Sequence, residues 1–275
     1  ERLGVSEEYL EREIATQETE TTRRLQAYRA GRPPVDLRAS LAPLGRSGDD
    51  RIDRWDGATL VRTIRLAPDE QVVAYAARVG DDPDRPTLEL LVAADDRARA
   101  TEVADGVRGG LLVDQGALHS LARADAQVAG LARRYRGVVP VLFGDPLTAL
   151  VRSISAQQVN LRWAATIRRR LAERYGARHV VGAREVWSLH VAPLAAARVE
   201  ELRELQLTTA KSLAIVGCAQ AALAGELHMA ELAALSDDQL IDHLTRLRGI
   251  GRWSAEWFLA RTLGRPRVVA GALGV

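Results

Sequence analysis

The stretch that decides the fold is Leu247-Arg248-Gly249-Ile250-Gly251, which lies between a segment of helical period ending near Arg246 and another beginning near Arg252. Two glycines one residue apart let backbone N–H groups point outward together at the start of a helix. Such a turn makes a cradle for a phosphate oxygen, and Ile250 would anchor it in the core. The same pattern is typical of an ordinary helix C-cap and tight turn, so the motif alone leaves both interpretations open.

Positive charge is concentrated around this turn. The 275-residue chain has 38 Lys and Arg against 36 Asp and Glu, a formal net charge of +2. Residues 246–267 nevertheless carry six arginines against Glu256, and residues 151–178 carry seven arginines against Glu173. Basic segments of this kind are typical of phosphate contacts in nucleic-acid binding. For Arg168-Arg169-Arg170 a solvated helix face is the alternative.

Composition changes twice along the chain. Residues 1–34 are polar and predict a solvated extension. Residues 35–112 contain short β-branched runs separated by turn residues, followed by a helical segment, and predict a small antiparallel sheet with a helix. Leucine and alanine then recur at helical spacing through residues 113–275, which predicts an all-α second domain. The expected fold class is therefore α+β.

Several classes of site are excluded by residue counts. The one cysteine, Cys218, cannot form an internal disulfide, a four-cysteine zinc site or an iron–sulfur cluster. The five histidines have no metal-ligand spacing, so no transition-metal cofactor is expected. No apolar stretch is long enough to cross a bilayer, and residues 1–10 lack a signal-peptide pattern. We therefore expect a soluble, cytoplasmic monomer with no membrane partner.

Three motifs give the sequence a resemblance to a known family. They are Asp145-Pro146-Leu147-Thr148-Ala149-Leu150-Val151-Arg152-Ser153-Ile154-Ser155-Ala156-Gln157-Gln158-Val159, the segment from Leu247 to Ala255, and Val269-Ala270-Gly271-Ala272-Leu273-Gly274-Val275. On these motifs, residues 35–275 resemble the helix-hairpin-helix DNA glycosylases, and within them the bacterial 3-methyladenine DNA glycosylase II branch. The resemblance implies a base excision repair enzyme that flips an alkylated purine out of damaged double-stranded DNA and hydrolyses its N-glycosidic bond.

The resemblance also implies roles for individual residues. Gln158, with Gln157 beside it, takes the wedge position that fills the gap in the duplex, and a pair of polar helix-end residues is the alternative. Trp253 and Trp257 lie four apart on one helix face, where they would form an aromatic wall for the base. An indole face attracts a cationic methylated purine by roughly 0.5–2 kcal/mol. Core packing is the alternative for both tryptophans.

The remaining implied contacts surround the hairpin. The DNA backbone is expected to lie against Gly249, Ile250, Gly251, Arg252, Ser254 and Ala255. The family's hairpin also holds a monovalent cation, which the resemblance assigns to the backbone carbonyls of Leu247 and Ile250.

Two positions separate subclasses of the family. Bifunctional members have a lysine where this chain has Trp253, and its amine forms a Schiff base that tryptophan cannot form. The resemblance therefore implies a monofunctional glycosylase. The family's Ala-Gly-Asp-Leu-Gly-Val motif supplies the aspartate that stabilises the oxocarbenium-like sugar, and Ala272 stands at that position here. Losing a positioned carboxylate removes on the order of 100- to 10,000-fold of rate.

Three explanations of Ala272 stay open: an engineered inactivating substitution, a naturally non-catalytic member, or a shifted register. The helix that follows this motif in the family is also not in the sequence. The alternative function is accordingly a catalytically inactive DNA-binding or damage-sensing protein on the same scaffold. A third alternative is a helical interaction domain with solvated arginine faces, which predicts no salt-dependent affinity for DNA.

Overall fold

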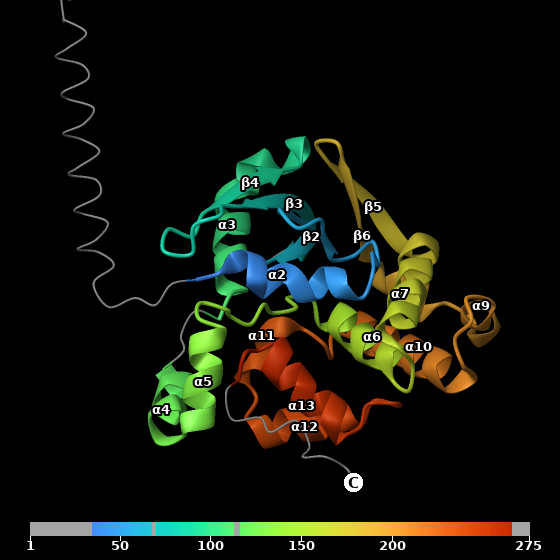
Figure 1. The fold of residues 1–275 in the computed structure, drawn as a ribbon. Coiled ribbons are helices and arrows are strands. Elements are labelled where there is room, and N and C mark those ends of the chain that lie inside the picture. Colours follow the sequence, from blue (N-terminus) through green and yellow to red (C-terminus); the bar gives the residue numbers. More distant parts are fainter. Residues whose placement is uncertain (1–34, 68–69, 113–115, 266–275) are drawn as a thin grey trace, which may run out of the picture. The chain divides into compact units, whose positions relative to one another are not determined.

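The computed structural model describes residues 35–67, 70–112 and 116–265. Val35–Val275 forms one compact unit, with an antiparallel sheet against a group of helices (Figure 1). The predicted mixed fold, helices with a small antiparallel sheet, is confirmed. The predicted extension over 1–34 lies outside the described residues, and the division between 112 and 113 stays a prediction. Among the described residues, no helix is long and apolar enough to cross a bilayer.

The sheet consists of four antiparallel strands in the order β1-β2-β3-β4, with β3 between β2 and β4. Alternating side chains of β3, such as Val73 and Tyr75, face α2 and α3 in a buried apolar cluster with Leu41 and Val103. This alternation is the period-two pattern of a β-strand, and the strands themselves were predicted from β-branched runs between turn residues. The elements of this part are α2 (Leu37–Arg46), β1 (Arg54–Trp55), β2 (Thr59–Leu66), β3 (Gln71–Val79), β4 (Leu88–Val92), the 3-10 helix η1 (Ala94–Arg99) and α3 (Ala100–Gly109).

The prediction that everything after residue 113 is helical is wrong. Strands β5 (Gly176–Val181) and β6 (Arg184–Leu189) form an antiparallel hairpin, with Gly182 at φ +58 in the turn between them. Val181 and Val186 of this hairpin pack on Val61, Ala74 and Ala76, the second face of the main sheet. The hairpin is stabilised by covering the apolar face of that sheet. This contact joins distant residues, so local sequence patterns do not predict it.

The other elements after residue 113 are helices around one apolar core. Helices α6 and α10 lie at its centre, with Leu150, Ile154 and Ile215 fully buried, and Phe258 of α13 packs beside them. The helices are α4 (Gly116–Ala124), α5 (Ala126–Arg134), α6 (Pro146–Ala156), α7 (Leu161–Tyr175), α8 (Val191–Ala195), α9 (Val199–Glu204), α10 (Thr209–Leu223), α11 (Met229–Ala234), α12 (Asp237–Thr245) and α13 (Arg252–Arg261).

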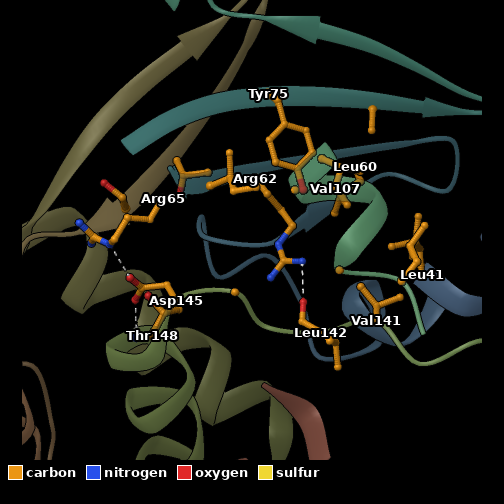
Figure 2. A pocket seen from close by; sticks show the side chains of 18 of the residues that line it. Leu41, Leu60, Arg62, Arg65, Tyr75, Val107, Val141, Leu142, Asp145 and Thr148 are labelled. Carbon is orange, nitrogen blue, oxygen red and sulfur yellow. Dashed lines mark hydrogen bonds and ion pairs between the residues drawn. The ribbon is translucent and has the colours of Figure 1, made fainter. Parts of the chain in front are cut away.

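The sheet fixes the start of α6. A cavity of about 70 Å³ lies between β2, β3, α3 and the segment that enters α6. Figure 2 shows side chains that line it. Arg62 donates from Nη1 to the Leu142 carbonyl at 3.1 Å, and Arg65 Nε lies 3.1 Å from Asp145 Oδ2. The other carboxylate oxygen of Asp145 accepts from the Thr148 amide at 2.7 Å and caps α6. The helix that leads to the predicted wedge is thus held at its first turn.

Candidate nucleic-acid interface

The C-terminal end of α6 carries a strained, exposed residue. Gln157 is the C-cap, and Gln158 after it has φ +55 in the left-handed region and an exposed side chain. This position after a helix normally holds glycine, because a Cβ there costs about 1 kcal/mol or more. Other non-glycine residues of the protein share this conformation, so it is the place of Gln158 beside the α12–α13 hairpin that makes its side chain a candidate for DNA contact. We call residues 157–158 the glutamine turn.

The hairpin between α12 and α13 is built as the glycine pattern predicted. Gly249 has φ +80, and a Cβ on it would lie 2.6 Å from Ala214 Cβ of α10, so only glycine fits. Ile250 is 4% exposed and anchors the turn in the core, whereas Gly249 and Gly251 are exposed. Gly251 is the N-cap of α13, with open space where its Cβ would be. Backbone amides at this helix start face an anion without steric hindrance.

One hydrogen bond joins the glutamine turn to the hairpin, and a second joins helices α6 and α13 behind them. Gln157 donates from Nε2 to the Gly249 carbonyl at 3.1 Å. Deeper in the molecule, the buried hydroxyl of Ser153 on α6 donates to Ser254 Oγ on α13 at 3.0 Å. The strained glutamine and the exposed glycines therefore belong to one surface.

The residues predicted to hold the DNA backbone do not all remain available. Gly249, Gly251 and Arg252 are exposed, as that role requires. Ser254 is 3% exposed with its hydroxyl engaged, so its backbone amide is what it can offer. Ala255 is fully buried, and its amide donates to the Gly251 carbonyl at 3.0 Å as the first regular bond of the helix. No group of Ala255 is left for a phosphate.

The two tryptophans have different environments. Trp253 is 52% exposed beside the hairpin. Trp257 is half-buried and stacks on Phe143, with ring centroids 5.6 Å apart and 22° between the ring planes. Trp253 and Trp257 line neither the cavity at the start of α6 nor the one between β1 and β6. The base pocket stays a prediction, as does the position of Ala272, because residues 266–275 lie outside the described residues.

The ring of Phe143 is surrounded by positive charge. The guanidinium carbons of Arg152, Arg261 and Arg62 lie 4.8, 5.5 and 5.7 Å from its centroid. Burial, together with Arg152 and Arg62, lowers the pKa of the Arg261 guanidinium. Phe143 thus holds together arginines from β2, α6 and α13 by cation–π contacts.

Arg168 is neither on a solvated face nor available to a phosphate. It is 3% exposed, and its Nε donates to Asp50 Oδ2 at 2.8 Å. Arg152 reaches the same oxygen at 3.0 Å and also pairs with Asp53, which pairs with Arg62. Burial raises the pKa of Asp50, but the charges of Arg152 and Arg168 outweigh it and lower that pKa to about 2. These five side chains form what we call the buried ion network.

Glu256 is a buried charged residue. Its side chain is 7% exposed, and its Oε1 accepts from Arg252 Nε at 2.8 Å. A buried carboxylate one turn into α13 thus orients the arginine at the start of the helix.

The hairpin carbonyls fit the type of ligand that a monovalent cation takes. Carbonyl oxygens are hard ligands with two lone pairs, and the Leu247 carbonyl uses one of them to accept from the Ile250 amide at 3.1 Å. The cation assigned to Leu247 and Ile250 stays a prediction. Within the described ranges no three His, Cys, Asp or Glu side chains cluster as metal ligands.

Comparisons with known proteins agree with this geometry. No family model matches the chain. A DNA-3-methyladenine glycosylase of Bacillus subtilis is 28% identical over 152 residues, 54% of this chain and 49% of that protein. The solved 3-methyladenine DNA-glycosylase of Archaeoglobus fulgidus matches with a TM-score of 0.68 and 21% identity, over 85% of this chain and 78% of that one. The sequence is thus similar to that of a DNA-3-methyladenine glycosylase, and the fold is that of the solved glycosylase.

A second solved structure has the same fold. The structure of MBOgg1 in complex with a low affinity DNA ligand matches with a TM-score of 0.64 and 16% identity, over 86% of this chain and 75% of that one. By sequence, the chain spans about half the length of its Bacillus relative. The shared fold includes the sheet as well as the helices, since both solved structures cover more than four fifths of the chain.

Proposed function

We propose that this protein is a monofunctional glycosylase of base excision repair that binds damaged double-stranded DNA, flips an alkylated purine of the 3-methyladenine type, and hydrolyses its N-glycosidic bond. The observation that carries the proposal is the strained, exposed Gln158 beside the open Gly249–Gly251 hairpin, tied to it by the bond from Gln157. The Bacillus and Archaeoglobus relatives, both named 3-methyladenine DNA glycosylases, support the choice of base.

The hairpin would grip the DNA backbone. The free amides of Gly251 and Arg252 at the start of α13 can donate to one phosphate, favoured by the helix dipole. Arg246 and Arg248 are exposed next to them and add positive charge. Neither kind of contact reads sequence, which suits an enzyme that must search long DNA for rare lesions.

Base flipping would use the glutamine turn and the exposed tryptophan. The side chain of Gln158 enters the stack and replaces the extruded nucleotide. The Trp253 indole then receives the base on its exposed face, and a methylated purine cation is attracted to that face. The cationic base is also a good leaving group, so water can attack the sugar carbon while the base departs with the bond electrons.

Ala272 limits the last step. Without a carboxylate there, the developing positive charge on the sugar lacks its partner, and hydrolysis should be about 100- to 10,000-fold slower than with aspartate. The direct test compares the native chain with Ala272→Asp on duplex DNA containing 3-methyladenine, measuring released base and abasic sites. Release by Ala272→Asp well above the native rate supports the proposal.

The second candidate function, a catalytically inactive damage binder, is favoured by Ala272 alone. If neither protein releases base while both bind an abasic duplex more tightly than an intact one, this candidate replaces the first. If affinity does not fall with salt, both DNA-based functions fail, because phosphate contacts release counterions.

The role of Trp253 has a matched control in the same protein. Trp253 and Tyr135 are 52% and 54% exposed, so replacing either with alanine disturbs packing equally little. We expect Trp253→Ala to lose affinity for a duplex with an extruded base by about tenfold. Tyr135→Ala should bind like the native chain, and an equal loss in both variants would contradict the assignment.

A further inference from the structure

Lys211 is the one lysine in the 275 residues, and its ammonium group binds the end of another helix. Its Nζ donates to the Gln157 carbonyl at 2.6 Å and to the Ser155 carbonyl at 3.2 Å. Both carbonyls lie in the last turn of α6, where backbone oxygens lack helical partners and carry partial negative charge. Lys211 therefore stabilises the end of α6 from α10.

This contact does not serve α10 itself. Lys211 lies in the first turn of α10, where the helix dipole disfavours a positive charge. The N-terminus of α10 is capped independently, since Thr208 Oγ1 accepts from the Lys211 backbone amide at 3.3 Å. Partial burial also lowers the pKa of the ammonium. The helix dipole and partial burial both disfavour a charged amine at this position. Its hydrogen bonds to the carbonyls at the end of α6 explain why it is there.

The first turns of α10 support the glutamine turn and the hairpin together. Lys211 holds the Gln157 carbonyl, and Ala214, one turn later, is the residue that Gly249 approaches so closely. The side chain of Gln157 closes the arrangement by donating to Gly249. Three contacts therefore fix the position of Gln158 relative to the hairpin: Lys211 to Gln157, Ala214 against Gly249, and Gln157 to Gly249. The contact from Lys211 is the one made by a charged group.

We propose that Lys211 is a positioning residue that locks the glutamine turn in the left-handed conformation and register at which Gln158 enters the base stack. This inference rests on the proposed function. The phosphate grip at Gly251 does not depend on Lys211, so removing the ammonium separates insertion into the stack from binding of the DNA backbone.

The first experiment uses Lys211→Met and Lys211→Arg in the full chain. The probe is a duplex with a tetrahydrofuran abasic site next to 2-aminopurine, whose fluorescence rises when the stack opens. We expect Lys211→Met to lose about tenfold of the preference for abasic over intact duplex, as for a lost hydrogen bond to a charged group. Its affinity for intact duplex and the salt dependence of that affinity should stay native. Lys211→Arg should keep most of the preference.

Arg169→Met is the matched control, since Arg169 is exposed on α7 and its loss removes the same charge. If Arg169→Met reduces the preference as much as Lys211→Met, net charge rather than position is responsible and the inference is overturned. It is also overturned if Lys211→Met raises the 2-aminopurine fluorescence of the abasic duplex as much as the native chain does.

A chemical version covers the case in which Lys211→Met folds poorly. Lys211→Cys can be aminoethylated with bromoethylamine, which rebuilds an ammonium on a side chain of lysine length. The native Cys218 is fully buried and burial raises its pKa to about 12, so it stays unreactive. The inference is supported if aminoethylated Lys211→Cys regains the preference for abasic duplex and the methylthiolated protein does not. It is overturned if the two modified proteins show the same preference.

Different results would contradict the proposed glycosylase function and the positioning role of Lys211. A native chain that does not distinguish abasic from intact duplex removes the proposed function, whatever Lys211 does. A native chain that does distinguish them, with Lys211→Met unchanged, removes the role of Lys211 alone.

Discussion

Residues 151–178 and 246–267 are similarly arginine-rich in sequence, but the fold takes two arginines of the first segment out of reach of a polyanion, whereas the arginines next to the hairpin in the second stay exposed. In the first segment, Arg168 is buried and Arg152 largely buried against Asp50, and both hold the sheet to the helices. In the second, Arg246, Arg248 and Arg252 remain at the surface around the hairpin. The comparison teaches that a count of local charge does not measure the charge that a polyanion meets, because the neutralising carboxylates come from about a hundred residues away.

The buried ion network should therefore matter to stability and the hairpin arginines to binding. Removing one member of a buried ion pair leaves an uncompensated charge in the interior, which costs about 3–5 kcal/mol. Losing an exposed arginine costs little folding free energy.

Arg168→Ala should lower the free energy of unfolding by about 3–5 kcal/mol, since Asp50 then loses its nearest guanidinium. Arg169→Ala, one residue along the same helix, should change it by less than about 0.5 kcal/mol. Urea unfolding followed by circular dichroism measures both. Similar midpoints for the two variants would mean that the buried ion network contributes no stability.

The low pKa of Asp50 predicts a loss of stability in acid. Its folded pKa of about 2 lies below its ordinary value of 3.8, so the charged form stabilises the fold above about pH 4. That contribution, on the order of 2 kcal/mol, disappears as the pH falls through the folded pKa. Unfolding free energies between pH 5 and pH 2 should fall more steeply for the native chain than for Asp50→Asn, and parallel curves would refute the assignment.

Gln158→Gly should stabilise the free protein by about 0.5–1 kcal/mol, because glycine relieves the left-handed conformation. The same variant should lose the 2-aminopurine response to an abasic duplex. Gln206→Gly is the matched control: Gln206 has φ +71, is exposed, and lies away from the hairpin after α9. It should leave DNA binding unchanged. Thermal melts and fluorescence titrations test the pair.

Arg248→Ala should reduce the slope of log affinity against log salt by about 0.9, the value for one lost phosphate contact. Its exposed side chain beside Gly249 makes it a candidate for such a contact. Arg169→Ala should leave the slope unchanged. Identical slopes in the two variants would show that the charge of the hairpin is no more available to DNA than that of α7.

The sequence was most informative where local rules decide the structure. The short β-branched runs between turn residues in 35–112 correspond to strands β2, β3 and β4. The spacing of Gly249 and Gly251 located the hairpin, because only glycine fits a positive φ against Ala214. In each case the physical requirement lies within a few residues of the signal.

The rest depended on contacts between distant residues. Helix α2 contains Pro43, which interrupts its helical pattern. Strands β5 and β6 are short, so their sequences show no clear strand periodicity. Burial of Arg168 required Asp50, 118 positions earlier, and burial of Glu256 required knowing which face of α13 meets the core. Within the site, the link from Gln157 to Gly249 and the support from Lys211 carry no local pattern, although the absence of other lysines made Lys211 conspicuous.

The β5–β6 hairpin has a consequence for how the chain acquires its structure. Because Val181 and Val186 supply the cover for one side of a sheet made more than a hundred residues earlier, a fragment stopping near residue 112 would present bare aliphatic groups of β2 and β3 to water. Such a fragment should self-associate rather than fold. During synthesis the sheet must wait for the later strands, so the two architectural layers gain their stability jointly.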